Sequence, residues 1–276
     1  MSQPQTVVFN LDHVIEILRS GVRRADVFMG IGVNASVVDP PISHVLSPGG
    51  MHHINLVKTD LTMEEKTHVA DEFGKWIRAN GLRELTETFS LFLDQLYQPL
   101  FIMQQGVTAD GVKLVRPDRL ERFGIVDKVE AMGLILPIIA DDRKILASLN
   151  RMRNCYAHRR GVVGPRDFDE GAETMTVSWN AFEMQVREPD GNIIPEAELY
   201  GRLLEQGGIV QLRVVERRRE FAPGTELVLE KRDLKEICLT SLSVGQRLLH
   251  ETVEYARKAG LLAGPVDENL DEPKPV

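Results

Sequence analysis

The chain has 276 residues, of which 43% are hydrophobic, and its formal net charge is -8 at pH 7. This hydrophobic content is enough for a packed core and excludes a globally disordered chain. The negative charge excludes a protein that coats nucleic acid over a broad basic surface, but it is compatible with a nuclease whose basic site is local.

Localisation is predicted from the cysteines and the apolar segments. The two cysteines, Cys155 and Cys238, have neither the number for a disulfide framework nor the spacing of metal ligands, which is typical of a reducing compartment. The N-terminal sequence lacks a basic stretch followed by a long apolar run. The most apolar window, residues 132–140, is too short to span a bilayer. We therefore expect a cytoplasmic protein without a membrane segment.

The N-terminal 60 residues predict a helix followed by an irregular extension. Apolar residues recur at helical spacing over 10–24. Residues 26–51 are rich in glycine and proline, which predicts a connector with little regular structure. We treat residues 1–60 as a unit outside the main helical region.

Two long helical runs follow. Thr62 and Glu65 form a capping box at the start of the first run, and Asn80-Gly81 predicts its end. The second run covers residues 82–105 and contains Pro99, a site for a kink. The two runs are predicted to be neighbouring bundle helices or one helix with a break.

The next helices are shorter. After a polar loop over residues 106–117, helical spacing returns over 119–132, and Pro137 marks a boundary. The following helix is predicted over 142–158, with Asp141 and Asp142 favouring its first turn through the helix dipole.

The C-terminal third begins with strands. Extended segments are predicted over 174–179, 181–186, 208–215 and 226–229, with a turn at 189–192. These segments predict a small antiparallel sheet within residues 163–231, and Arg217-Arg218-Arg219 is interpreted as a solvated turn. A last helix is predicted over 234–261, and the acidic, proline-bearing tail, residues 263–276, is predicted to be disordered.

Residues 149–161 carry the strongest chemical signal. An arginine, an amide and a histidine (Arg153, Asn154 and His158) lie within one and a half helical turns, and Gly161 closes the segment. Arginine binds phosphate through paired, charge-assisted hydrogen bonds, and histidine exchanges protons near neutral pH. Together they suffice for cleavage of RNA without a metal ion.

Helical geometry separates these side chains. Asn154 and His158 are four residues apart and share a face, with Arg151 close to them, whereas Arg153 lies roughly 140° from His158. Arg153 and His158 can therefore bind the same phosphate only if the helix is distorted or if two chains build the site. In the simpler alternative, Arg153 pairs with an acid of a neighbouring helix and His158 caps the C-terminus.

The sequence Arg153-Asn154-Cys155-Tyr156-Ala157-His158 resembles the Rx4–6H motif of the HEPN superfamily of helical domains, which includes many ribonucleases. The resemblance implies a mainly α (α+β) fold: an antiparallel helical bundle over residues 61–162 plus 232–262, with the β-rich insert at 163–231. It implies a homodimer in which Arg153, Asn154 and His158 cleave RNA without cofactor or metal, in a toxin–antitoxin or antiviral setting, with an antitoxin protein as a further partner. The alternative is a non-catalytic HEPN-like module that binds RNA, nucleotide or a protein.

A basic cluster surrounds the motif. No aspartate or glutamate interrupts the segment from Arg143 to Arg166, whose seven cations are Arg143, Lys144, Arg151, Arg153, Arg159, Arg160 and Arg166. Of these we expect Arg151, Arg159 and Arg160 to bind the RNA backbone.

Five further residues have simpler interpretations. Tyr156 and Trp179 are predicted to pack in the core, and Cys155 to be a small buried filler. His52-His53 is a weak metal candidate, because no cysteine or carboxylate pattern accompanies it.

Overall fold

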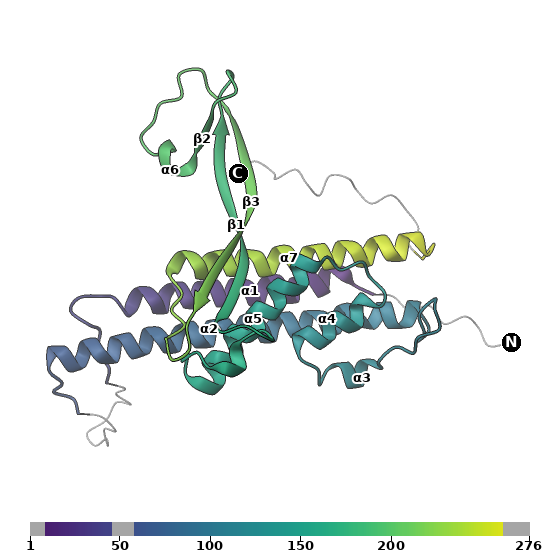
Figure 1. Ribbon diagram of the computed structural model, residues 1–276, viewed down its shortest axis with the longest axis horizontal. Helices are drawn as coiled ribbons and strands as arrows, with labels where there is room; N and C mark the ends of the chain where they lie inside the picture. Colours follow the sequence, from purple (N-terminus) through teal and green to yellow (C-terminus); the bar gives the residue numbers. More distant parts are fainter. Residues whose placement is uncertain (1–8, 46–57, 262–276) are drawn as a thin grey trace.

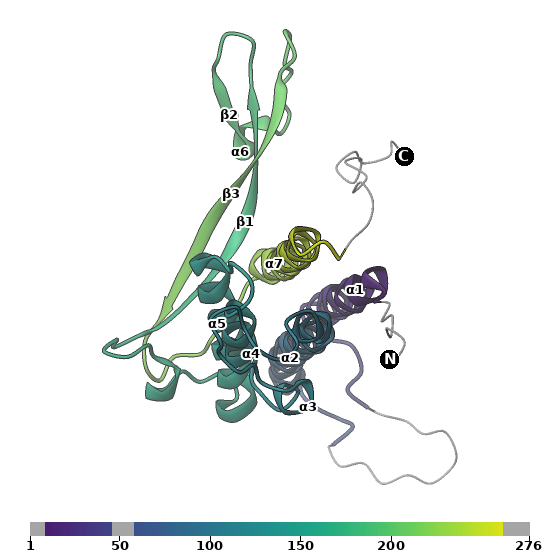
Figure 2. The same cartoon turned by 90° about the vertical axis from the view of Figure 1, so that its right-hand side faces the viewer.

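A body of packed helices carries a projecting β-sheet (Figures 1 and 2) in the computed structural model, which describes residues 9–45 and 58–261. The helices are α1 (Leu11–Ala35), α2 (Met63–Met103), α3 (Pro117–Leu120), α4 (Ile125–Gly133), α5 (Ala140–Arg159), α6 (Glu196–Leu199) and α7 (Lys231–Lys258), with a 3₁₀ turn at Pro165–Asp167. The strands are β1 (Met175–Arg187), β2 (Ile193–Pro195) and β3 (Ile209–Phe221). They form an antiparallel sheet in the order β2-β1-β3. The predicted class, mainly helical with a small antiparallel sheet before the last helix, is confirmed.

Helix α2 is continuous over 41 residues, so the predicted break at Asn80-Gly81 is wrong. Gly81 lies where α2 meets α1, and a Cβ atom there would be 2.1 Å from Met29 Cγ. The glycine therefore permits close helix packing instead of ending the helix. The Asn80 side chain donates to the Trp76 carbonyl one turn earlier, within the same helix.

Helix α1 belongs to the helical body and is not a separate extension. Leu18 is fully buried, and a Cβ atom on Gly245 of α7 would lie 2.1 Å from its Cδ2 atom. Gly21 approaches Thr88 of α2 equally closely. Helix α1 therefore packs against both α2 and α7, which run alongside it in Figure 1.

Other predicted elements also differ from the structure. The helix predicted over 119–132 is divided into α3 and α4. The segment 226–229 is not a strand, although it contributes buried Leu227 and Leu229 to the core. Arg217-Arg218-Arg219 lies inside β3 and is not a turn.

Carboxylates on adjacent elements allow these arginines to lie in a strand. Arg217 donates to Glu183 of β1 at 2.7 Å, and Arg219 donates to Asp233 of α7 at 3.0 Å. Both acids are distant in sequence, which is why the charge run alone predicted a solvated segment.

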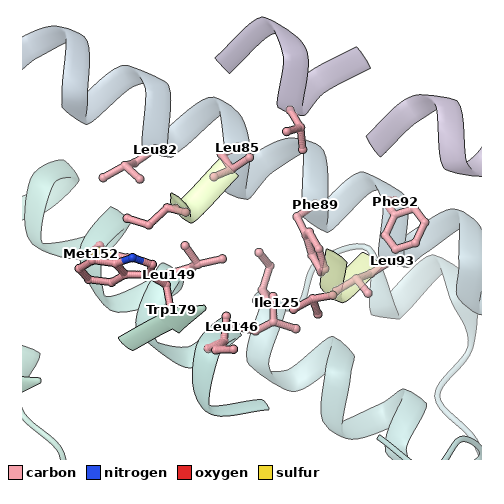
Figure 3. Packing of buried hydrophobic residues seen from close by; sticks show 14 of the residues in the cluster. Leu82, Leu85, Phe89, Phe92, Leu93, Ile125, Leu146, Leu149, Met152 and Trp179 are labelled. Atoms are coloured by element: carbon pink, nitrogen blue, oxygen red, sulfur yellow. The ribbon is translucent and has the colours of Figure 1, made fainter. Parts of the chain in front are cut away.

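The first half of β1 lies between α5 and α7 and joins the sheet to the body. Trp179 is 1% exposed, and its indole N–H donates to Glu236 of α7 at 2.8 Å. Figure 3 shows its ring packed near Leu149 and Met152 of α5. The predicted core role of Trp179 is confirmed.

The second half of β1 leaves the body together with β3, and Figures 1 and 2 both show this part of the sheet projecting away from the helices. We call residues 182–214 the arm. Among the described ranges, no helix has the length and apolar character needed to cross a bilayer.

Two glycines of α1 provide a test of the packing. Gly21→Ala places a methyl group about where Thr88 now lies, whereas the space around Gly30 is open. We expect Gly21→Ala to lower the free energy of unfolding by about 1–3 kcal/mol through overpacking. Gly30→Ala should raise it by about 0.5–1 kcal/mol, because alanine is the better helix former. Urea denaturation of both variants checks this, and equal effects would contradict the α1–α2 contact.

Candidate functional site

Helix α5 presents the motif with the predicted core face inward. Ile145, Leu149, Met152 and Tyr156 are buried along one stripe. The Tyr156 hydroxyl donates to the Leu227 carbonyl, and burial raises the pKa of this phenol. The predicted packing role of Tyr156 is confirmed, so its hydroxyl is committed to the structure.

His158 lies on the opposite face of α5, near its C-terminus, and is exposed. Within the described residues its ring makes no hydrogen bond. Asn154 is one turn earlier on the same face and is half-buried. The helix ends directly afterwards, because Arg160 adopts a left-handed conformation with φ of 54° and Gly161 has φ of 82°. His158 is therefore free to contact a ligand or a second chain.

Arg153 is half-buried, and its guanidinium turns toward Asn154. Its Nη1 atom donates to Asn154 Oδ1 at 3.0 Å. Over residues 9–45 and 58–261, no carboxylate oxygen lies within 4.0 Å of Arg153, so the acid predicted by the simpler alternative is not found there. Asn154 thus links Arg153 to the face that carries His158.

Two of the three predicted phosphate-binding arginines are held in ion pairs. Arg151 pairs with Asp169. Arg159 binds both carboxylate oxygens of Asp167, with 2.8 Å between its Nε and Oδ2. Asp167 is 1% exposed and also accepts from the Gly164 backbone N–H at 2.9 Å. Arg159 therefore anchors the 3₁₀ turn, and Arg160 is the exposed member of the three.

The basic cluster of the sequence is partly neutralised in space. Lys144 pairs with Glu216 of β3, in addition to the two pairs just described. The carboxylates come from residues that follow the cluster in the chain, beyond Arg166. Four cations have no ion pair within the described part of the chain: Arg143, Arg153, Arg160 and Arg166.

A small cavity of about 150 Å³ opens beside the end of α5. Its wall includes Arg160, together with Lys75 and Arg78 of α2. Hydrogen bonds to Asp71 and Glu226 raise the pKa of Lys75, which is held in that ion-pair network. The motif alone did not indicate the two α2 residues, because the fold brings them there across about 80 positions of sequence. The cavity gives Arg160 basic neighbours but does not include Arg153 or His158.

Cys155 is fully buried, and desolvation raises the pKa of its thiol to about 11. A thiol with this pKa is mostly protonated at neutral pH and is a poor nucleophile, in agreement with its predicted role as a filler. Over the described ranges, no three histidine, cysteine, aspartate or glutamate side chains gather as a metal site. His52-His53 lies outside the described residues.

Comparison of the chain with known protein families, with curated proteins and with solved structures found no match.

The Arg159–Asp167 pair can be tested by a double-mutant cycle. Arg159→Ala leaves a buried carboxylate without its partner, so we expect the free energy of unfolding to fall by about 3 kcal/mol. Asp167→Asn in the same chain should recover part of that loss, because the uncompensated charge is gone. Urea denaturation measures each corner of the cycle. An unchanged stability of Arg159→Ala would contradict the anchoring role and return Arg159 to the substrate-binding candidates.

Proposed function

We propose that the protein is a metal-independent endoribonuclease of HEPN type. In this reaction the 2′-hydroxyl of RNA attacks the adjacent phosphorus, the P–O5′ bond breaks, and a 2′,3′-cyclic phosphate forms. His158 removes the 2′-hydroxyl proton or protonates the leaving 5′-oxygen. Arg153 stabilises the charge on the phosphoryl oxygens. Asn154 positions the Arg153 guanidinium, and Arg160 contacts the RNA backbone.

The observation that carries this proposal is the state of two motif side chains, His158 and Arg153. His158 is exposed and makes no hydrogen bond within the described residues, and Arg153 has no carboxylate partner there. A half-buried guanidinium without an acid is costly unless something else compensates its charge. A phosphate group supplies that compensation and matches the forked geometry of arginine.

The proposed site contains two chains. Arg153 and His158 leave α5 roughly 140° apart by helical geometry. The α5 surfaces of two copies, facing each other across a two-fold axis, bring Arg153 of one copy toward the partner's His158. The setting of a toxin or antiviral factor, with an antitoxin as partner, follows from the family resemblance.

The second candidate is a binding module without catalysis. It is favoured by one observation: Arg151 and Arg159, two of the three predicted phosphate-binding arginines, are committed to ion pairs. In that case the motif face binds RNA, nucleotide or a protein surface, and the RNA stays intact.

RNA cleavage in the presence of EDTA tests the first candidate. We expect His158→Ala to lower the rate by about 100-fold or more, the usual contribution of a general acid or base. His250→Ala, which removes another exposed histidine on α7, is the matched control and should leave the rate unchanged. Products should end in 2′,3′-cyclic phosphate. Intact RNA with folded wild-type protein, together with RNA binding that Arg153→Ala abolishes, would favour the binding module.

Mixing two inactive variants tests whether two chains build the site. Arg153→Ala and His158→Ala should each be inactive alone. In a mixed dimer, the Arg153→Ala chain supplies His158 and the other chain supplies Arg153, so one complete pair forms. We expect cleavage to return after the two variants are unfolded and refolded together. A mixture that stays inactive, although mixed dimers form, would place both residues of a working pair in one chain.

A further inference from the structure

The two long strands of the arm have outer edges of different character. On β1, the edge that faces away from β3 is covered within the body by helix hydroxyls. The Ser178 N–H donates to Ser148 Oγ of α5 at 3.1 Å, and the Asn180 N–H donates to Thr240 Oγ1 of α7 at 3.1 Å. Nearer the tip, β2 pairs with the same edge. On β3, the outer edge is not covered by any strand of the described sheet.

The covered edge reveals which backbone groups of β3 point outward. Because the Ser178 and Asn180 N–H groups donate away from β3, the backbone N–H and C=O groups of even-numbered β1 residues point away from β3. When two residues lie opposite one another in an antiparallel pair, their backbone N–H and C=O groups either both point toward the other strand or both point away from it. The register pairs Met184 with Leu212, so the backbone groups of even-numbered β3 residues point away from β1. The N–H and C=O groups of Val210, Leu212 and Val214 therefore lie on the free edge.

Nothing on this edge opposes pairing with another strand. Natural edge strands are usually blunted by proline, lysine, a bulge or a covering segment. Residues 209–215 read Ile-Val-Gln-Leu-Arg-Val-Val, with one charge and neither proline nor lysine. The ladder to β1 runs from Ile209 to Phe221 without a bulge. The side chains of Val210, Leu212 and Val214 are 60%, 71% and 60% exposed.

We propose that this edge pairs with β3 of a second copy of the chain, antiparallel and centred on Leu212. The two three-stranded sheets then become one six-stranded sheet. Leu212 lies opposite its own copy, and Val210 lies opposite the partner's Val214. Three pairs of outward-pointing residues exchange about six backbone hydrogen bonds.

The side chains favour this register and a second copy as the occupant. Centring on Leu212 sets Ile209 opposite the partner's Val215 and Gln211 opposite the partner's Arg213, so no like charges face each other. A shift that centres on Arg213 opposes two arginines, which is destabilising. A shift that centres on Val214 places Glu216 opposite the partner's Leu212. A two-fold axis requires such a self-complementary sequence, and residues 209–215 provide it.

This contact is separate from the motif-facing dimer of the proposed function. Lys144, near the start of α5, contacts Glu216 at the base of the arm, whereas Tyr156 lies more than three turns further on. Antiparallel arms therefore hold the two motifs at opposite ends of the joined sheet. The arm contact is small, so we expect concentration-dependent association. RNA cleavage does not report on it.

Cysteine substitution tests the register. Leu212→Cys brings two thiols face to face, since the paired Cα atoms lie about 5.5 Å apart, within the range for a disulfide. Ile209→Cys is the control, because its copies are about 20 Å apart along the joined strands. The native Cys155 and Cys238 are buried and do not compete. Under mild oxidation we expect a covalent dimer for Leu212→Cys and none for Ile209→Cys. Equal yields would overturn the register.

Charge substitution tests the contact itself by sedimentation across a dilution series. Leu212→Lys blunts the edge, so association should weaken by at least tenfold. Leu203→Lys changes an equally exposed arm residue outside β3 and should have no effect. A wild-type protein that stays monomeric at every concentration would overturn the proposal. So would an assembly that Leu212→Lys leaves unchanged, such as a dimer that forms only through α5.

Discussion

The hydrogen bonds from β1 to the hydroxyls of α5 and α7 are the constraint on which the rest of the structure depends. A strand buried between two helices must satisfy the backbone groups on the edge without a neighbouring strand, and each unpaired buried donor costs about 1–3 kcal/mol. Ser148 of α5 and Thr240 of α7 accept the two backbone N–H groups on this edge, and both residues are buried. Thr240 also donates to the Asn180 carbonyl, so the same hydroxyl satisfies both groups of that residue. The strand thereby fixes the position of α5, and with it the motif, while its other half extends as the arm.

The motif region illustrates how the fold assigns different tasks to similar side chains. Arg151 and Arg159 are drawn to Asp169 and Asp167, which lie in the segment after the helix. Arg153 and Arg160 have no such partner within the described residues. A basic cluster that looks uniform along the chain is therefore divided into arginines that hold the structure and arginines that are available to a ligand.

Local sequence patterns were enough to predict the buried helical stripe of α5, the capping box of α2 and the burial of Trp179. These features depend on residues within a few positions of each other or on strong burial preferences. The continuity of α2 could not be predicted in the same way, because Gly81 is a helix breaker in isolation and a close-packing residue once α1 lies against it. The arginine run of β3 was misjudged for the same reason, since its compensating acids come from β1 and α7. The roles of Arg151 and Arg159 likewise depend on contacts made only after folding.

The most direct measurement is a crystal structure of the protein with an RNA oligonucleotide whose 2′-hydroxyls are methylated, so that cleavage is blocked. The account predicts a phosphate group between Arg153 of one chain and His158 of the partner subunit, with both side chains within hydrogen-bonding distance of its oxygens. A bound RNA that avoids the α5 motif, or two motifs that face away from each other and from the RNA, would contradict it.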